Sequence, residues 1–259
     1  FLTIGVYILL TSMYTTFNIV FLGFVCNETE VGYYTTATKL HAIFIGMFSA
    51  FTGVMLPRMS SLISEKKIDI FEQTINKSFN LLFVFALPIV IFTEIFAPQI
   101  INIIAGPGYN LAITPMRIVM PLIMIIGYEQ ILVLQILMPM KQDKQILIGS
   151  CIGAFVGIIC NVLLVKTLKS TGSAIAWLIS EHTVLIIAKY FSNNIVKLSI
   201  QMKNVFLQSM LSIPCIIILF VVKDLIINNF ASLIIGISIV TIYYLIIYIY
   251  IIKSKLSSL

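Results

Sequence analysis

The stretch "SFNLLFVFALPIVIFTEIFAPQIINII", residues 78–104, contains a single charged side chain, Glu94. A helix that crosses the hydrocarbon core of a bilayer needs about 20 consecutive apolar residues, and this stretch is longer than that. It shows no period-2 alternation, and backbone groups in lipid must form their hydrogen bonds within the segment. The stretch therefore predicts a membrane-spanning α-helix.

The same pattern recurs along the chain, which predicts an all-α integral membrane protein. About eight spans are expected, at residues 1–26, 40–57, 78–104, 118–140, 145–165, 173–188, 204–222 and 225–252. Of the 259 residues, 60% are hydrophobic and 10% are charged, whereas a soluble domain has about 45–50% apolar and about 25% charged residues. A chain of this length cannot bury so much apolar surface in one core, so lipid must cover it.

Basic residues between the spans predict the orientation. One set of connections holds eleven: Arg58, Lys66, Lys67, Lys77, Lys141, Lys144, Lys189, Lys197, Lys203, Lys253 and Lys255. The other set holds five: Lys39, Arg117, Lys166, Lys169 and Lys223. The positive-inside rule places the first set, and with it the C-terminus, in the cytoplasm. This topology accounts for the net charge of +6 better than nucleic-acid binding does.

The longest connection, "EKKIDIFEQTINKSF", carries apolar residues at helical spacing. Ile68, Phe71, Ile75 and Phe79 recur with charged residues between them. This pattern favours an amphipathic helix, at about residues 65–77, on the cytoplasmic surface, with an ordinary polar loop as the alternative.

Prolines and glycines inside the spans indicate local distortion and close packing. Pro88 and Pro121 predict kinks, since proline removes a backbone donor. Gly149, Gly153 and Gly157 lie four residues apart on one helix face, which favours close approach of a second helix. The four cysteines are scattered without a C-x-x-C pair, so we expect neither disulfides nor a metal site.

Ionisable residues inside the spans are the first candidates for function. At mid-bilayer such a group costs on the order of 3 kcal/mol and usually faces a cavity or a partner. Glu129 lies near the middle of its span, either as a proton-coupling group or as a hydrogen-bonded packing residue. Glu181 and His182 are further proton-coupling candidates, although neighbours on a helix project about 100° apart. Glu94 lies nearer the end of its span and is a weaker candidate.

The block "VGYYTTATKL", residues 31–40, follows the first span. Gly32, Tyr34, Ala37 and Lys39 are similar to the G-x-Y-x-x-A-x-K block of the polysaccharide repeat-unit flippases. These are the O-antigen transporter type within the multidrug/oligosaccharidyl-lipid/polysaccharide exporter superfamily. We expect Gly32 and Tyr34 to form an external turn, after which Lys39 enters the bilayer.

Further blocks resemble the later half of the same family, in the same order. They are "LPRMS" at residues 56–60, a proline-bearing span and glycine turn at residues 85–121, and "NVLLVKTLKSTGSAIAWLISE" at residues 161–181. In the last block Asn161, Gly172, Ala174 and Ala176 match, while Ser173 stands where glycine or alanine is common.

The resemblance implies a MATE-like fold of two pseudo-symmetric bundles of six spans, plus two extra C-terminal helices. Residues 1–190 would form the second bundle, and residues 191–259 the two additional spans. Because Phe1 already lies inside an apolar run, we expect an N-terminal half of the same transporter to precede it.

The resemblance also implies a function: translocation of undecaprenyl-pyrophosphate-linked oligosaccharide across the bacterial inner membrane for O-antigen or capsule assembly. Lys39 and Arg117 both begin spans at the external face, either as snorkelling anchors or as a cationic lining that attracts pyrophosphate. Tyr14 and Asn18 are candidates for contacting sugars. Besides the lipid-linked oligosaccharide and membrane lipid, expected partners are a polymerase and a chain-length regulator.

Other functions remain open. A multidrug exporter of the same superfamily is one alternative, and a membrane-embedded polysaccharide polymerase or acyltransferase is another. Polymerases typically carry a large external loop, and here the external connections are short. No Walker A glycine loop is present, and we expect no catalytic residue and no cofactor.

Overall fold

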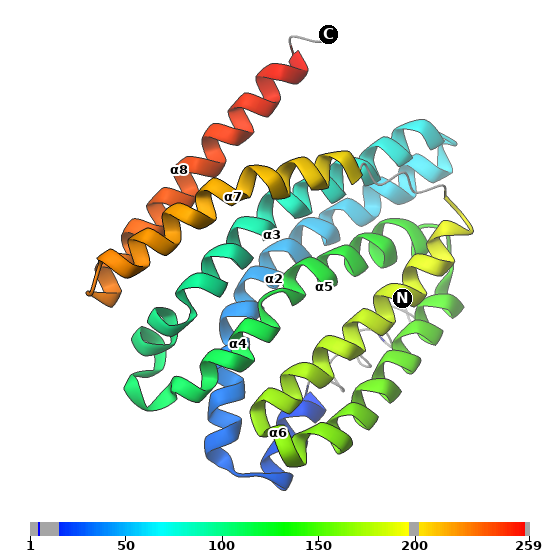
Figure 1. Cartoon of the computed structure of the whole chain (residues 1–259). Coiled ribbons are helices and arrows are strands. Elements are labelled where there is room, and N and C mark those ends of the chain that lie inside the picture. The colour runs from blue at the N-terminus through cyan, green and yellow to red at the C-terminus, as the bar shows by residue number, and fades with distance from the viewer. Residues whose placement is uncertain (1–4, 6–15, 197–201, 257–259) are drawn as a thin grey trace.

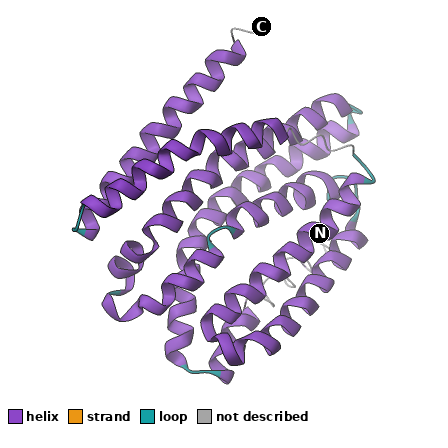
Figure 2. Cartoon of the chain, viewed as in Figure 1, coloured by secondary structure: helices purple, strands orange, loops and turns teal. Residues whose placement is uncertain are grey.

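The computed structural model describes residues 5, 16–196 and 202–256, and within them every regular element is a helix (Figure 2). The elements are the helix Thr16–Val25, α2 (Glu28–Ser64), α3 (Ile68–Ala105), the 3₁₀-helix η1 (Pro107–Ala112), α4 (Ile113–Val119), α5 (Leu122–Gln130), the π-helix η2 (Ile131–Leu137), α6 (Asp143–Asn193), α7 (Met202–Leu225) and α8 (Asn229–Leu256).

Six helical segments of the described chain are long and apolar enough to cross a membrane. One of them, α6, has 51 residues and turns back on itself at Lys169, whose φ of 52° and ψ of −128° are not helical. We call the parts of α6 before and after Lys169 its first and second arms. The two arms lie against each other, since Ser180 Oγ of the second donates a 2.8 Å hydrogen bond to Gly153 O of the first. The helix Thr16–Val25 is a shorter apolar segment. The chain is an all-α, multi-pass membrane protein, as predicted.

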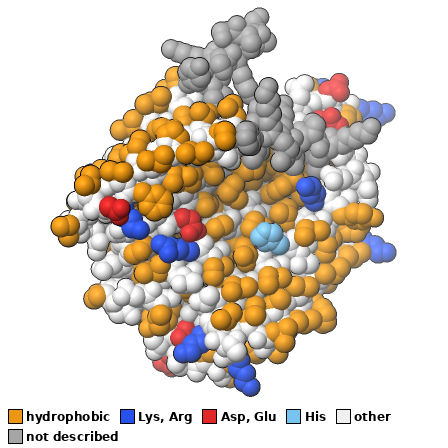
Figure 3. Space-filling model, viewed as in Figure 1, with side chains coloured by type: hydrophobic (Ala, Val, Ile, Leu, Met, Phe, Trp, Pro, Cys, Tyr) orange, Lys and Arg blue, Asp and Glu red, His pale blue; other side chains and the backbone are white. Residues whose placement is uncertain are grey.

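The helices form a layered bundle (Figure 1). The segment from α4 to η2 packs against α2, α3 and α6, while α7 and α8 lie side by side along α3, away from α6. Two tyrosines join α7 to α8: Tyr243 Oη donates to Leu211 O at 2.6 Å, and Tyr244 Oη lies 2.7 Å from Ser212 Oγ. On the face shown in Figure 3, hydrophobic side chains predominate, and the few charged side chains gather mostly in small groups of both signs.

The predicted external turn at Gly32 and Tyr34 is wrong, because α2 begins earlier than expected. Asn27 caps the helix by accepting a 2.9 Å hydrogen bond from the Glu30 amide, and two acidic residues in the first turn complement the helix dipole. Gly32 lies inside α2, where its lack of a side chain leaves room for the Tyr109 ring; an added Cβ would lie 3.3 Å from Tyr109 Oη.

The stretch expected as a surface helix continues directly into a span. Helix α3 begins at Ile68 and runs without interruption to Ala105. Phe71, Ile75 and Phe79 are buried on one face, so the apolar spacing marks inward packing of the first turns of a long helix. The side of the membrane on which they lie stays a prediction.

Proline has different effects at the two expected kinks. Pro88 lies inside α3, which continues past it. Pro121 lies between α4 and α5, where the helix is interrupted. After α5 the helix continues as the wider π-helix η2. There Met138 N donates a 2.9 Å hydrogen bond to the carbonyl of Val133, five residues earlier.

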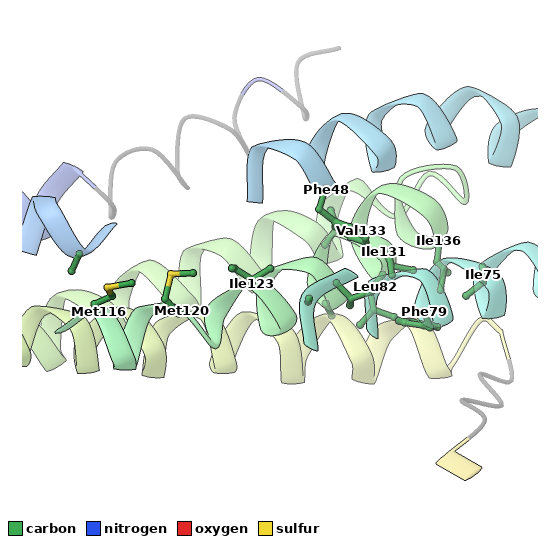
Figure 4. Packing of buried hydrophobic residues seen from close by; sticks show 14 of the residues in the cluster. Phe48, Ile75, Phe79, Leu82, Met116, Met120, Ile123, Ile131, Val133 and Ile136 are labelled. Carbon is green, nitrogen blue, oxygen red and sulfur yellow. The ribbon is translucent and has the colours of Figure 1, made fainter. Parts of the chain in front are cut away.

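The largest hydrophobic cluster holds the central helices together. Phe48 of α2, Leu82 of α3 and Ile131 of η2 are nearly or fully buried in it (Figure 4). The predicted glycine packing is confirmed: a Cβ on Gly153 would collide with Val184 Cγ2, and one on Gly157 would lie 3.1 Å from Ser180 Oγ.

Candidate functional site

A cavity of about 550 Å³ lies between α2, α5 and the second arm of α6, and we call it the polar cavity. Its lining consists of Ile19, Thr35, Thr38, Lys39, His41, Ala42, Ile45, Ser49, Ile126, Glu129, Gln130, Trp177 and Glu181. Small-molecule binding sites are concave and carry a few convergent polar groups, which this lining supplies.

The helical period of α2 places its polar residues on the cavity wall. Thr35, Thr38, Ala42, Ile45 and Ser49 recur every three or four residues and all line the cavity. The motif "VGYYTTATKL" therefore contributes to the cavity through the face of α2 that carries its threonines.

Three of the residues selected from the sequence meet here: Lys39, Glu129 and Glu181. The two glutamates are buried, with 3% and 2% of their surface exposed, whereas Lys39 is exposed. We therefore call the part of the cavity at Lys39 its open side and the part at the two glutamates its buried side.

Two further residues on the buried side were not selected from the sequence. Trp177 Nε1 donates a 2.8 Å hydrogen bond to Glu181 Oε1. The His41 ring packs edge-on against the Trp177 ring, with centroids 5.0 Å apart. His41 Nε2 has no hydrogen-bond partner in the described part of the chain, although only 2% of the residue is exposed. The sequence signals were a lone histidine in an otherwise uncharged run and a tryptophan four residues before Glu181.

Gln130 is fixed in the cavity wall by two hydroxyl groups of α2. Its Nε2 donates to Ser49 Oγ at 2.8 Å, and its Oε1 accepts from Thr52 Oγ1 at 3.1 Å. These contacts join α5 to α2 beside Glu129, so the polar groups of this wall are positioned before any ligand binds.

Arg117 and His182 lie outside the lining of the polar cavity. Arg117 is exposed, and its Nε donates a 3.3 Å hydrogen bond to the backbone oxygen of Glu94. His182 is exposed as well, with Nδ1 2.8 Å from Leu178 O, while its neighbour Glu181 is buried. Tyr14 lies outside the described residues.

Asn18 belongs to a buried hydrogen-bond network rather than to the cavity lining. Its Oδ1 accepts from Asn161 Nδ2 at 2.6 Å, and its Nδ2 donates to Tyr34 Oη at 3.3 Å. Ser173 Oγ donates to Asn161 Oδ1 at 3.4 Å. The network connects Thr16–Val25 and α2 to both arms of α6. Tyr34, Asn161 and Ser173, which lie in the sequence blocks that resemble the flippase family, therefore have buried hydrogen-bond partners.

A second hollow, an apolar groove of about 660 Å³, lies between α2, α3 and α8. Its lining is hydrophobic apart from Thr93, Thr241 and Tyr244. None of the ionisable residues selected from the sequence reaches this groove, which makes the polar cavity the candidate site. Within the described residues, no group of three or more His, Cys, Asp or Glu side chains could hold a metal ion.

Long apolar helices around a polar cavity characterise this multi-pass membrane protein. The model of a family described as polysaccharide biosynthesis protein matches residues 2–114. A putative O-antigen transporter of Escherichia coli (strain K12) is 25% identical over 186 residues, which cover 71% of this chain and 44% of that protein.

The solved structure of the lipid II flippase MurJ, in an inward closed conformation, has the same fold with a TM-score of 0.80 and 15% identity. The match covers 97% of this chain and 53% of that one. The chain thus spans about half the length of the relatives it matches. Together the comparisons confirm the resemblance to polysaccharide flippases of this superfamily that the sequence motifs indicated.

Proposed function

We propose that the chain forms one half of a flippase that moves undecaprenyl-pyrophosphate-linked repeat units across the bacterial inner membrane for O-antigen or capsule assembly. The observation that carries this proposal is the polar cavity, where α2, α5 and α6 bring Lys39, Glu129 and Glu181 together inside a flippase-like fold. Charged groups are expensive at membrane depth and mark substrate or ion pathways.

Each charged group receives a role in the proposal. The exposed Lys39 ammonium attracts the pyrophosphate at the open side, and the lipid tail stays in the bilayer. Glu129 and Glu181 exchange protons as the cavity changes its access, which couples transport to a proton gradient. No covalent bond is broken, so the protein is not an enzyme and requires no cofactor.

An N-terminal half of the same transporter would complete the path. Residues 1–190 act as the second bundle, with residues 191–259 as two additional spans and the C-terminus in the cytoplasm. A polymerase and a chain-length regulator receive the translocated units.

Surface polysaccharide in cells carrying the complete transporter tests the proposal. We expect Lys39→Ala to lower the amount of polysaccharide at unchanged protein level, because the phosphate loses its counter-charge. Arg117→Ala tests the second predicted cation separately: a loss extends the anionic path beyond the cavity, and a normal amount makes Arg117 an interface anchor. Normal polysaccharide with Lys39→Ala contradicts the role of Lys39.

Multidrug export is the second candidate, favoured by one observation. The cavity is lined by two buried glutamates and one lysine, a composition that suits organic cations when both glutamates are ionised. Ethidium accumulation in cells with and without the transporter separates the two functions. Export of ethidium at normal polysaccharide levels supports the second.

A further inference from the structure

We propose that the buried side of the polar cavity, formed by His41, Trp177 and Glu181, binds a sugar unit through its hydroxyl groups and its apolar ring face. The inference rests on the proposed function and deepens it. It assigns the sugar to the buried side of the cavity and the pyrophosphate to the open side near Lys39.

The ring nitrogen of His41 is the first observation that supports a sugar site. A buried polar atom without a partner is uncommon in a folded protein and calls for an explanation. His41 lines the cavity, and its Nε2 lacks a partner within the described residues. A ring nitrogen in this position can donate to or accept from a hydroxyl group. A bound sugar hydroxyl would supply the missing hydrogen bond.

The indole ring of Trp177 is the second observation that supports a sugar site. Trp177 is largely buried, and the part of its indole ring that lines the cavity provides an apolar surface against which the C–H face of a pyranose ring can pack. The hydrogen bond to Glu181 and the edge contact with His41 hold this ring in place. Little side-chain entropy is therefore lost when a ligand binds against it.

The polar groups around these rings match a ligand with many hydroxyl groups. Carboxylate oxygens of Glu129 and Glu181 accept from hydroxyls, and the hydroxyl of Thr38 can both donate and accept. The apolar side chains of Ile19, Ala42, Ile45 and Ile126 also line the cavity. An uncharged, polyhydroxylated ring fits this mixture of groups.

The charges decide between sugar and phosphate on the buried side. Glu129 and Glu181 are both nearly inaccessible to solvent, and Lys39 belongs to the open side. Whenever these carboxyl groups are ionised, a pyrophosphate placed between them would meet like charges at low dielectric, which is strongly unfavourable. A neutral sugar meets no such repulsion.

Trp177 is the only tryptophan of the 259 residues, so its fluorescence reports on the cavity directly. The chain is reconstituted in nanodiscs and titrated with four neutral sugars, namely glucose, galactose, rhamnose and N-acetylglucosamine, and separately with inorganic pyrophosphate. We expect a saturable change in Trp177 emission with at least one sugar. No response to any of the four sugars overturns the proposal.

Paired histidine variants test the assignment. His41→Ala and His41→Gln are expected to weaken sugar binding at least about tenfold, the loss typical of a buried contact residue. His182→Ala is the matched control, since this second histidine of the chain is exposed and lies outside the cavity lining; its binding should match the unchanged protein. Thermal unfolding of each variant shows that the fold is intact, and His41→Gln stands in if His41→Ala does not fold.

Two outcomes separate this inference from the proposed function. Loss of polysaccharide with Lys39→Ala, together with unchanged sugar binding in both His41 variants, overturns the sugar site and leaves the flippase function standing. A fluorescence response to pyrophosphate that disappears with His41→Ala also overturns it, because the phosphate then occupies the buried side.

Discussion

Trp177 and Glu181 lie one helical turn apart on the second arm of α6, and the indole Nε1 donates a 2.8 Å hydrogen bond to the carboxylate. Both side chains line the polar cavity, and both are buried. The pair explains how a carboxylate is accommodated within a membrane span while an aromatic ring is held at the cavity wall.

Removing the carboxylate should release the ring. We expect Glu181→Ala to lower the fluorescence anisotropy of Trp177 and to destabilise the protein by roughly 1.5–3 kcal/mol, the contribution of a hydrogen bond to a charged group. His182→Ala alters the neighbouring exposed position and should leave both quantities unchanged. Equal anisotropy in both variants would show that other contacts fix the ring.

Glu129 is the group to test for proton coupling. We expect Glu129→Gln to preserve the shape of the buried side chain while weakening the pH dependence of transport in proteoliposomes, because glutamine cannot exchange a proton and only Glu181 would remain to do so. Glu94→Gln is a suitable comparison, since Glu94 lies outside the cavity lining. A transport rate that varies with pH as before removes Glu129 as a coupling site.

Replacing Lys169 with glycine should stabilise the protein. Its φ of 52° lies in the region that favours glycine, and such a conformation costs about 1–3 kcal/mol in other residues. The ion pair from Lys169 Nζ to Glu30 Oε1, at 3.6 Å, offsets little of this because the lysine is mostly exposed. We expect Lys169→Gly to raise the midpoint of thermal unfolding in detergent.

The control for that substitution is Lys166→Gly, three residues earlier in regular helix. There glycine should lower stability by about 1 kcal/mol, because it gains freedom in the unfolded chain. If both glycine variants lower the midpoint, the backbone at Lys169 is not strained.

Gly153 should not tolerate a larger residue. We expect Gly153→Val to destabilise the protein by roughly 1–3 kcal/mol, because the new side chain meets Val184 and the backbone oxygen of Ser180. Gly46→Val on α2 serves as the comparison, since no atom lies within 4 Å of a Cβ placed there. Thermal unfolding of the two variants measures the difference.

The fold class and most of the spans could be predicted from hydropathy, since lipid requires long apolar helices wherever the chain crosses it; the predicted first span, residues 1–26, lies mostly outside the described residues. The start of α2 could not, because tyrosines and threonines after an acidic stretch resemble a loop until the Asn27 cap is seen. The turn at Lys169 was predicted only as a gap between two apolar runs, and its backbone angles depend on packing between the arms of α6.

The candidate site could be predicted only in part from the sequence. A charge inside an apolar run is conspicuous, which identified Glu129 and Glu181. Which helix faces meet is decided by tertiary packing, so adjacent residues such as Glu181 and His182 end in different surroundings. For the same reason Arg117 was selected although it lies outside the cavity, while His41 and Trp177 were missed.

The π-helix η2 makes the chain tolerant of a length change directly after Glu129 and Gln130. Its backbone bonds span five residues, as from Met138 N to Val133 O, so it contains one residue more than an α-helix would need there. A one-residue deletion within Ile131–Leu137 can be absorbed by a return to α-geometry. The same deletion in α2 would rotate its later cavity-lining residues by about 100° around the helix axis. We therefore expect one-residue deletions to be tolerated in η2 and not in α2.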